Sequence, residues 1–533
     1  MHTPPRAEPR SVRNGRVRHP EHSGPGGDEG DKTLTSALLG VDIGTTHCKA
    51  GTFDLAGEVI CLASHPTPSH HTADGHPCYD PEALWEAVIA VIQEVLSAAA
   101  ERSVEVVGIA GMAEAGLLVD AASGAPRTEI IPWFDPRSTE QMEIIERESD
   151  PWSLFRRSGL RPSFKYGLSK ILWLRQMNPA ITSGAIWLSV PDYIMYRLTG
   201  RMATDPTLAA RTYVYDLTAG SWDAAWIRHF DLDPAVFPEV HPSGSCAGNV
   251  TALAAQATGL TMGTPVALSG HDHICTLLAA SITTPGPVLD SIGTAESVLG
   301  VLDRLTLDHA AFESGMTIAP HVLGGLWCWL GGTPAAGGSI EWLRAQLGEE
   351  PLSYDQLDYL LKEVDREPGD ILYVPYLAGS GAPVHNLHVR AAFAGLSASH
   401  GRADLVKAVL EGTAYEFESI RRAAEGLTGV PIREVLIVGG GARNSRWVQI
   451  RADVSNCTCR TLSLSDATTL GAALTAALGC GLLDNLASVT EIASRYQGDY
   501  RTFTPEPGRH RRYHHLYETQ YEPIQAFLRG KTE

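Results

Sequence analysis

The chain has 533 residues, 44% of them hydrophobic and 19% charged, an ordinary balance for a globular protein that is too long to form a single core. Its 42 basic and 61 acidic residues give a formal net charge of −19, which argues against nucleic acid or an anionic membrane as the main partner. No apolar run is as long as the roughly 18 residues that a membrane-spanning helix requires.

The beginning of the chain is rich in Pro, Gly, Arg and Asp and has no hydrophobic period, which predicts a disordered leader over residues 1–35. This segment also lacks the apolar stretch of a secretory signal. The nine cysteines show no disulfide spacing, and the isolated C-x-C of Cys457 and Cys459 favours reduced, buried thiols over a zinc site. We therefore expect a cytoplasmic protein.

Strand-like runs and helical periods alternate along the chain, which predicts α/β layers. In the first half we expect strands over 38–53, 59–64 and 104–110, and helices over 81–100, 168–176 and 192–198. In the second half we expect a strand over 434–438 and helices over 337–347, 402–425 and 469–478. We predict two domains, 36–282 and 283–525, with the border near residue 282.

Two short segments read like copies of one device: Val41-Asp42-Ile43-Gly44-Thr45-Thr46, and Asp290-Ser291-Ile292-Gly293-Thr294. Each follows an apolar run, turns at Ile-Gly-Thr and continues as a second strand. A glycine lets the backbone approach a phosphate closely, and the neighbouring hydroxyl and N–H groups can donate hydrogen bonds to its oxygens. Either segment alone could be an ordinary hairpin turn, but the repetition predicts two turns that hold a polyphosphate from both sides.

Several segments resemble the FGGY family of carbohydrate kinases, and the resemblance covers roughly residues 37–520. The most specific match is Ala391-Ala392-Phe393-Ala394-Gly395-Leu396, followed after a gap by Asp404-Leu405-Val406-Lys407-Ala408-Val409-Leu410-Glu411. The N-terminal signature of the family fits at Lys170 and Trp173 but departs at Gly167. The resemblance implies two ribonuclease H-like domains of the actin-like ATPase fold around a central cleft.

The resemblance also implies ATP and Mg²⁺ as cofactors. It assigns Gly44, Thr45, Thr46 and Lys49 to the first phosphate loop, with Gly293 and Thr294 as the second. The strand over 266–268 ends in a glycine turn that presents Asp272, the position of the family's catalytic base, which can accept the hydroxyl proton. Asp42 and Asp272 would face Mg²⁺ through water.

Two alternatives stay open for the His271-Asp272-His273 segment: a metal site, or a buried structural Asp272. In the resemblance, the two histidines flank the catalytic position and help to select the sugar.

Further substrate contacts are implied at Glu114, Trp133, Asp135 and Arg137, where an aromatic ring and polar groups would recognise a polyol. Trp133 could instead belong to the core, and Arg137 could pair with Asp135. Ala113 stands where glycerol kinases carry a basic residue, which disfavours glycerol.

The adenosine segment is implied by a glycine turn that directly follows the strand over 434–438. Its cofactor-binding residues are Gly440, Gly441, Ala442 and Asn444. Gly337 lies in a glycine-rich stretch, 331–338, that leads into a helix whose N-terminus would favour a phosphate.

We therefore expect an ATP-dependent kinase that phosphorylates a hydroxyl of a small carbohydrate: a sugar, ketose, sugar acid or polyol. Two other interpretations are a sugar-responsive binding protein of the same fold and an actin-like ATPase that needs no sugar. The sequence does not identify the sugar or the hydroxyl, and it leaves a homodimer open.

Overall fold

A computed structural model of the protein describes residues 35–364, 367–461, 467–495 and 501–530. The predicted leader, residues 1–35, lies outside these ranges except for Thr35. Thr35 already belongs to the first strand, so regular structure begins one residue earlier than the sequence indicates.

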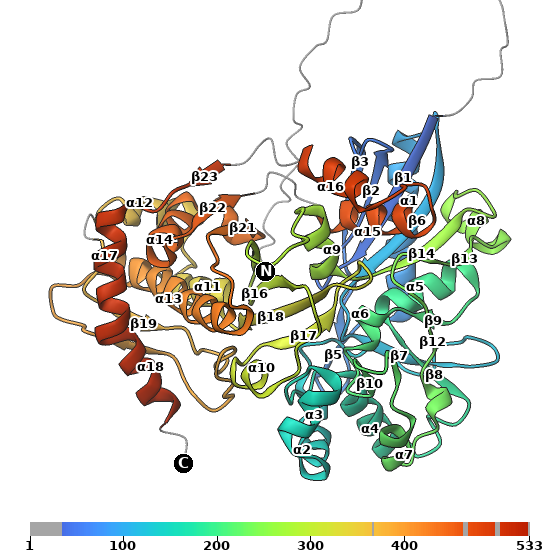
Figure 1. Cartoon of the computed structure of the whole chain (residues 1–533), viewed down its shortest axis with the longest axis horizontal. Coiled ribbons are helices and arrows are strands. Elements are labelled where there is room, and N and C mark those ends of the chain that lie inside the picture. Colours follow the sequence, from blue (N-terminus) through green and yellow to red (C-terminus); the bar gives the residue numbers. More distant parts are fainter. Residues whose placement is uncertain (1–34, 365–366, 462–466, 496–500, 531–533) are drawn as a thin grey trace, which may run out of the picture.

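The N-terminal half contains a six-stranded sheet in the order β13-β14-β6-β1-β2-β3 (Figure 1). Its strands are β1 (Thr35–Ile43), β2 (His47–Asp54), β3 (Val59–Pro66), β6 (Arg102–Gly111), β13 (Cys246–Asn249) and β14 (Pro265–His271). β1, β2 and β3 form an antiparallel meander, whereas β6 and β14 run parallel to β1 and to each other. The parallel strands β1, β6 and β14 therefore end at one edge of the sheet.

The C-terminal half repeats this topology in a seven-stranded sheet, β17-β18-β16-β15-β21-β22-β23. Its strands are β15 (Val288–Ile292), β16 (Glu296–Leu302), β17 (Thr317–Pro320), β18 (Trp327–Thr333), β21 (Glu434–Val438), β22 (Thr458–Thr461) and β23 (Arg501–Phe503). The run β18-β16-β15-β21-β22 has the same antiparallel and parallel pairings as β3-β2-β1-β6-β14. The two Ile-Gly-Thr turns thus occupy equivalent places in two related units.

Helices cover both faces of each sheet, because the residues of the central strands alternate between two cores. One face of the first sheet packs against α1 (Pro81–Ala98) and α5 (Val190–Thr199), and the other against α9 (Asp272–Ala279) and α15 (Ala467–Gly479). The second sheet packs against α13 (Arg402–Thr428) and α14 (Ser445–Ser455). α11 (Ala336–Gln346) and α12 (Tyr354–Leu361) contact α13 in turn.

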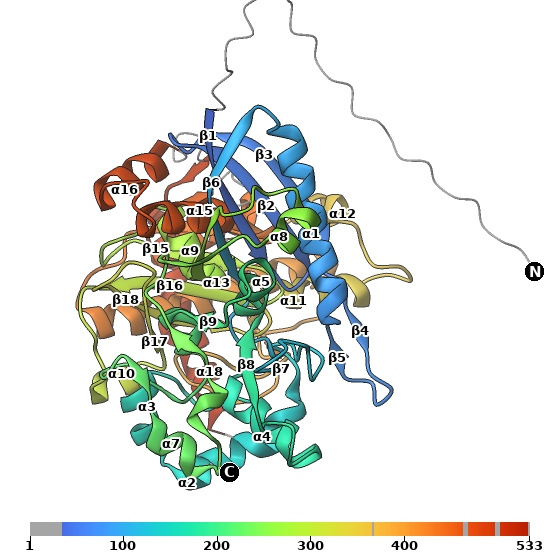
Figure 2. The same cartoon turned by 90° about the vertical axis from the view of Figure 1, so that its right-hand side faces the viewer.

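The two sheets share one hydrophobic core, built around α9 and α15. This core combines residues of the first sheet, such as Leu38 and Val106, with residues of the second, such as Leu289 and Leu436. α15 follows the last parallel strand of the second sheet in sequence, yet it packs on the first sheet beside β1 and β6 (Figures 1 and 2). The sequence predicted that this helix belongs to the domain over 283–525. The predicted domain border near residue 282 stays a prediction.

Strand and helix predictions agree with the structure to within a few residues at most positions. The strand over 434–438 and the helices over 81–100 and 192–198 are found as β21, α1 and α5. The predicted 38–53 run is divided by the phosphate turn into β1 and β2. Within the described ranges, each helix is either too short or too polar for a membrane span.

Close backbone contact fixes α15 against α9 and the first sheet. A Cβ atom on Gly471 would lie 2.0 Å from the Cys275 carbonyl oxygen, and one on Gly40 would lie 1.8 Å from the Thr469 carbonyl oxygen. Both clashes are with backbone, which cannot move aside as a flexible side chain can. Only glycine is compatible with this packing.

Gly471→Ala is expected to lower the free energy of unfolding by about 1–3 kcal/mol, because the added methyl overpacks the shared core. Gly426→Ala in α13 is the matched control, since a Cβ there meets no atom within 4 Å, and it should be neutral or stabilising by about 0.5–1 kcal/mol. Urea denaturation followed by circular dichroism measures both. Equal stability of the two variants would contradict the packing argument.

Candidate active site

Three parallel strands of the first sheet end side by side, and the predicted site residues of the N-terminal half follow directly after them. Ile43 of β1 and His271 of β14 both pair with Gly111 of β6. The residues that follow these three positions are the first phosphate turn, the segment that contains Glu114, and Asp272. Ligands in α/β folds bind outside the carboxyl ends of parallel strands, so this edge is the candidate active site.

Asp272 is the first residue of α9, directly after β14, and its side chain is 22% exposed. Its Oδ1 accepts a hydrogen bond from the His273 backbone N–H at 2.7 Å and lies 2.7 Å from Nδ1 of His271. Burial by itself raises the pKa of Asp272, but attraction to the His273 ring and contact with His271 outweigh it, so the net pKa is lowered. The carboxylate is therefore ionised at neutral pH, and the helix N-terminus favours that charge.

The turn before Asp272 is held by a buried polar network. The backbone N–H of His271 donates to Thr207 Oγ1 at 2.9 Å, and Thr207 in turn donates to Asp205 Oδ1 at 2.8 Å. Gly270 has φ +103°, and a Cβ there would lie 2.3 Å from Thr207 Oγ1. Glycine is thus required at this bend by both conformation and space.

Ligand atoms of His271, Asp272 and His273 lie within 4.8 Å of one another, so the metal interpretation of this segment is geometrically open. Burial lowers the pKa of His273, although Asp272 acts in the opposite direction. In its neutral form His273 can accept as well as donate a hydrogen bond.

Glu114 lies in a charge cluster with two cations that sequence reasoning did not single out. Its Oε1 accepts hydrogen bonds from Arg211 Nε at 3.0 Å and Nη2 at 2.6 Å, and Lys165 Nζ lies 3.7 Å away. Burial acts to raise the pKa of Glu114, but Arg211 and Lys165 hold it well below the usual range. Nη1 of Arg211 is buried, and it has no hydrogen-bond partner among the described residues. No sequence motif marks Arg211, because it meets Glu114 only through the fold.

Trp133 is tied to the first phosphate turn. Its Nε1 donates to Thr45 Oγ1 at 2.9 Å, and the hydroxyl of Tyr79 donates to the Thr45 carbonyl at 3.3 Å. Thr46 is exposed beside it. The ring also packs edge-on against Phe134. The structure thus brings Trp133 to the site edge, where its substrate role stays a prediction.

Asp135 and Arg137 form the ion pair that the sequence left open as an alternative. Asp135 is fully buried, and its Oδ2 accepts from Arg137 Nη2 at 2.6 Å. Arg137 also donates to the Pro77 carbonyl at 2.8 Å and lies over the Trp173 ring. Both side chains are engaged with protein groups, so this geometry favours a role in shaping the 133–137 segment. Their direct contact with substrate stays a prediction.

Lys170, one of the matched signature residues, connects two segments that are predicted to contact the substrate. It is fully buried, and its Nζ donates to the carbonyl oxygens of Glu114 at 2.6 Å and Pro132 at 2.9 Å. Burial lowers its pKa to about 7. The signature therefore marks a residue that positions the site.

Asp42 and Lys49 are direct cross-strand partners of β1 and β2. Directly paired residues share one face of a sheet, so both belong to the same face on the two sides of the phosphate turn. Asp42 is nearly buried, at 7% exposure, whereas Lys49 is half-buried. A carboxylate and an ammonium beside this turn suit a metal-bound phosphate.

In the C-terminal half, the segments that are predicted to bind the nucleotide also lie close together. Gly337 and Gly338, at the start of α11, donate backbone hydrogen bonds to the carbonyls of Gly293 and Thr294 at 3.0 and 2.9 Å. β15 and β21 pair in parallel with Ser291 opposite Val438, so the second phosphate turn lies beside the glycine turn after β21.

The glycine turn leaves no room for a side chain at Gly441, although Gly440 is open. A Cβ on Gly441 would lie 2.5 Å from the Ile292 side chain, whereas Gly440 meets nothing within 4 Å and Ala442 is nearly buried. Asn444 caps α14, accepting from the Trp447 N–H at 3.0 Å and donating to Asp358 at 3.1 Å. Both hydrogen bonds are to protein groups, so the predicted contact of Asn444 with adenosine stays a prediction.

A fully buried cation holds the second phosphate turn. Arg451 of α14 donates to Asp290 Oδ2 at 2.8 Å and to Glu296 Oε1. All three side chains have no exposure, and Asp290 and Glu296 flank the turn on β15 and β16. Asp290 belongs to the repeated motif that the sequence shows, whereas Arg451 was not predicted because its place in the fold is not signalled locally.

Comparison with known proteins gives a consistent result. A family model described as the FGGY family of carbohydrate kinases, N-terminal domain, matches residues 37–279, and that of the C-terminal domain matches residues 289–480. The glycerol kinase of Thermus brockianus is 30% identical over 464 residues, covering 84% of this chain and 90% of that protein. The xylulose kinase of Staphylococcus xylosus is 27% identical over 447 residues, covering 83% and 90%.

Among solved structures, the crystal structure of xylulose kinase from Rhodospirillum rubrum superposes with a TM-score of 0.81 at 28% identity, covering 92% of this chain and 99% of that chain. The repeated sheets and this structural match thus define a kinase of the actin-like ATPase fold. The chain belongs to the FGGY family of carbohydrate kinases, enzymes that use ATP to phosphorylate an alcohol group of a small carbohydrate.

Arg451→Met is expected to lower the free energy of unfolding by about 3–5 kcal/mol, because two buried carboxylates would lose their counter-ion. The control is Arg460→Met, which breaks a partly exposed pair with Glu434 at 3.6 Å and should cost no more than about 1 kcal/mol. Urea denaturation of both variants provides the comparison. A loss for Arg451→Met no larger than that for Arg460→Met would show that the buried cluster is unimportant for the turn.

Proposed function

We propose that this kinase transfers the γ-phosphoryl group of ATP to a hydroxyl of a ketopentose or a closely related polyol, with Asp272 as the general base. The observation that carries the proposal is the position of Asp272. It lies at the carboxyl end of β14, beside the ends of β1 and β6 that carry the first phosphate turn and the Glu114 segment.

The chemistry follows from the contacts of Asp272. Its Oδ1 is engaged by the His273 N–H and lies against His271, so we assign the acceptance of the substrate proton to Oδ2. An ionised carboxylate there orients the hydroxyl in line with the phosphoryl group. We assign the turns at Gly44 and Gly293 to the two sides of the triphosphate, where the hydroxyl and N–H groups of Thr45 and Thr294 stabilise the developing charge.

The donor set also fits Mg²⁺. Asp42 and Asp272 offer hard carboxylate oxygens, which this ion binds directly or through retained water. Mg²⁺ bound there would neutralise phosphate charge. Lys49, the cross-strand neighbour of Asp42, would contact the transferred group.

The substrate class rests on relatives and on three residues, Ala113, Glu114 and Arg211. Relatives named xylulose kinase and glycerol kinase cover 83% and 84% of the chain. Ala113 lacks the basic side chain expected for glycerol, whereas Glu114 and Arg211 beside it supply a carboxylate and the buried Nη1 for sugar hydroxyls or a carbonyl. A ketopentose offers both kinds of group.

Coupled measurement of ADP release tests the activity directly. With Mg-ATP and a panel of pentuloses, hexoses, tetritols, glycerol and sugar acids, we expect strong release with one or a few ketopentoses. Release that is independent of the panel would support the actin-like ATPase, and no release would support the binding protein. Strongest release with glycerol would retain the kinase but refute the ketopentose assignment.

Asp272→Asn should lower kcat by about 10²–10⁴-fold, because the amide cannot accept the hydroxyl proton. Nucleotide binding, measured by calorimetry, should persist, since the phosphate turns are unchanged. Asp231→Asn is the control, because Asp231 is 91% exposed. Near-normal turnover of Asp272→Asn would remove the carboxylate from the mechanism.

A further inference from the structure

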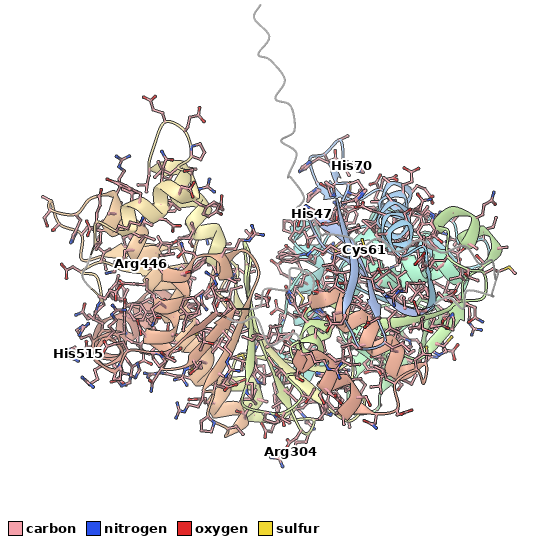
Figure 3. The ribbon with its side chains drawn as sticks, turned by 90° about the horizontal axis from the view of Figure 1, so that it is seen from above. His47, Cys61, His70, Arg304, Arg446 and His515 are labelled. Atoms are coloured by element: carbon pink, nitrogen blue, oxygen red, sulfur yellow. The ribbon has the colours of Figure 1, made fainter. Side chains whose placement is uncertain are left out.

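A second cluster of ligand-type side chains lies outside the candidate active site, at the base of a hairpin formed by β4 (His70–His71) and β5 (Pro77–Cys78). His70 Nε2 lies 3.0 Å from Glu129 Oε2 and 3.3 Å from Cys78 Sγ. One ligand atom from each of the three residues lies within 4.8 Å of the other two. Figure 3 shows His70 at the margin of the N-terminal lobe, beyond His47.

The backbone explains why these three residues meet. His70 and Cys78 are direct partners in the antiparallel β4–β5 ladder, and direct partners place their side chains on one face. Tyr79, the residue after Cys78, pairs with Ile130. In the register of that bridge Glu129 is a diagonal neighbour of Cys78 on the same face. Residues from two separate segments thus form one donor set where the two-stranded β4–β5 sheet meets Glu129.

The contacts argue against a simple hydrogen-bonded relay. In a Cys–His–carboxylate relay the thiol and the carboxylate use opposite ring nitrogens, as the general triad arrangement requires. Here both approach Nε2 of His70. One nitrogen cannot donate to the carboxylate and accept from the thiol at once. Three donor atoms that converge on a single point are instead the arrangement that a cation needs.

We propose that His70, Cys78 and Glu129 bind a divalent transition-metal ion of the Zn²⁺ type, with water in the fourth position. Imidazole nitrogen, thiolate sulfur and carboxylate oxygen are the ligands that Zn²⁺ takes, at bond lengths of about 2.0–2.3 Å. A tetrahedral ion with these bonds would separate the nitrogen from the oxygen and the sulfur by about 3.4–3.6 Å. The observed 3.0 and 3.3 Å require an expansion of only a few tenths of an ångström.

The charges fit as well. A divalent ion that binds Cys78 would replace the proton of its thiol. Thiolate and carboxylate together would balance the two charges of the ion. Mg²⁺, which prefers oxygen ligands, does not suit this donor set.

The location gives the ion a structural consequence for the active site. Tyr79, next to Cys78, donates to the carbonyl of Thr45 in the first phosphate turn at 3.3 Å. The carbonyl of Pro77, on the other side of Cys78, accepts from Arg137 at 2.8 Å. Both neighbours of Cys78 thus contact predicted site segments, so an ion at Cys78 would fix the hairpin that supports them.

The test uses the full chain and two probes, Zn²⁺ in calorimetry and Co²⁺ in absorption spectroscopy. We expect one site per chain in which Co²⁺ shows a sulfur-to-metal charge-transfer band. His70→Gln and Glu129→Gln should each weaken the binding at least about tenfold, and Cys78→Ser should abolish the band. The side chains of His70 and Glu129 are half-exposed, so the variants at these two positions are expected to fold.

His71→Gln is the matched control, because His71 is the exposed neighbour of His70 on the other face of β4. Cys61→Ser controls for a thiol elsewhere on the same lobe (Figure 3). The other histidines contribute a background that is common to all variants. Affinity in His70→Gln and Glu129→Gln equal to that in His71→Gln, or Co²⁺ binding without the thiolate band, would overturn the proposal. Because neither readout uses turnover, the result is independent of the proposed kinase substrate.

Discussion

The arrangement of this protein depends on one shared hydrophobic core that joins its two sheets. α9 and α15 fill that core, and α15 approaches α9 so closely that Gly471 leaves no space for a Cβ beside the Cys275 carbonyl. Asp272 is the first residue of α9. The candidate base is therefore attached to a packed helix that contacts both sheets, rather than to a flexible loop.

Buried charges complete this framework where apolar packing alone would not hold a turn. Arg451 donates hydrogen bonds to both acids that flank the second turn, and Lys170 donates to the carbonyls of Glu114 and Pro132. Removing one partner of a buried ion pair strongly destabilises the fold, because the other charge stays buried without compensation. Gly44 and Gly293 donate their own N–H groups to the carbonyls of His47 and Ala295, which fixes the shape of each turn.

Much of the site could be predicted from sequence because its residues are local. The Ile-Gly-Thr turns, the strand before Asp272 and the Gly439-Gly440-Gly441 turn are each defined by a few consecutive residues, and the structure places them at strand ends. Local patterns could not find Arg211 or Arg451, because each meets its partners only after folding. The pairing of Asp135 with Arg137 was foreseen only as an alternative, since two residues of spacing permit both an ion pair and two independent ligands.

The most specific family signature illustrates the same division. Glu411 within it is buried and accepts hydrogen bonds from Tyr513 and the Gly369 N–H, so this part of the signature holds the C-terminal domain together. By itself the sequence determined the fold class, the two repeated turns and the candidate base, because short-range patterns encode strands and turns. The tertiary structure alone decided which charges neutralise one another, where α15 packs, and that His70, Cys78 and Glu129 meet. Those contacts depend on strand register and on packing between distant segments.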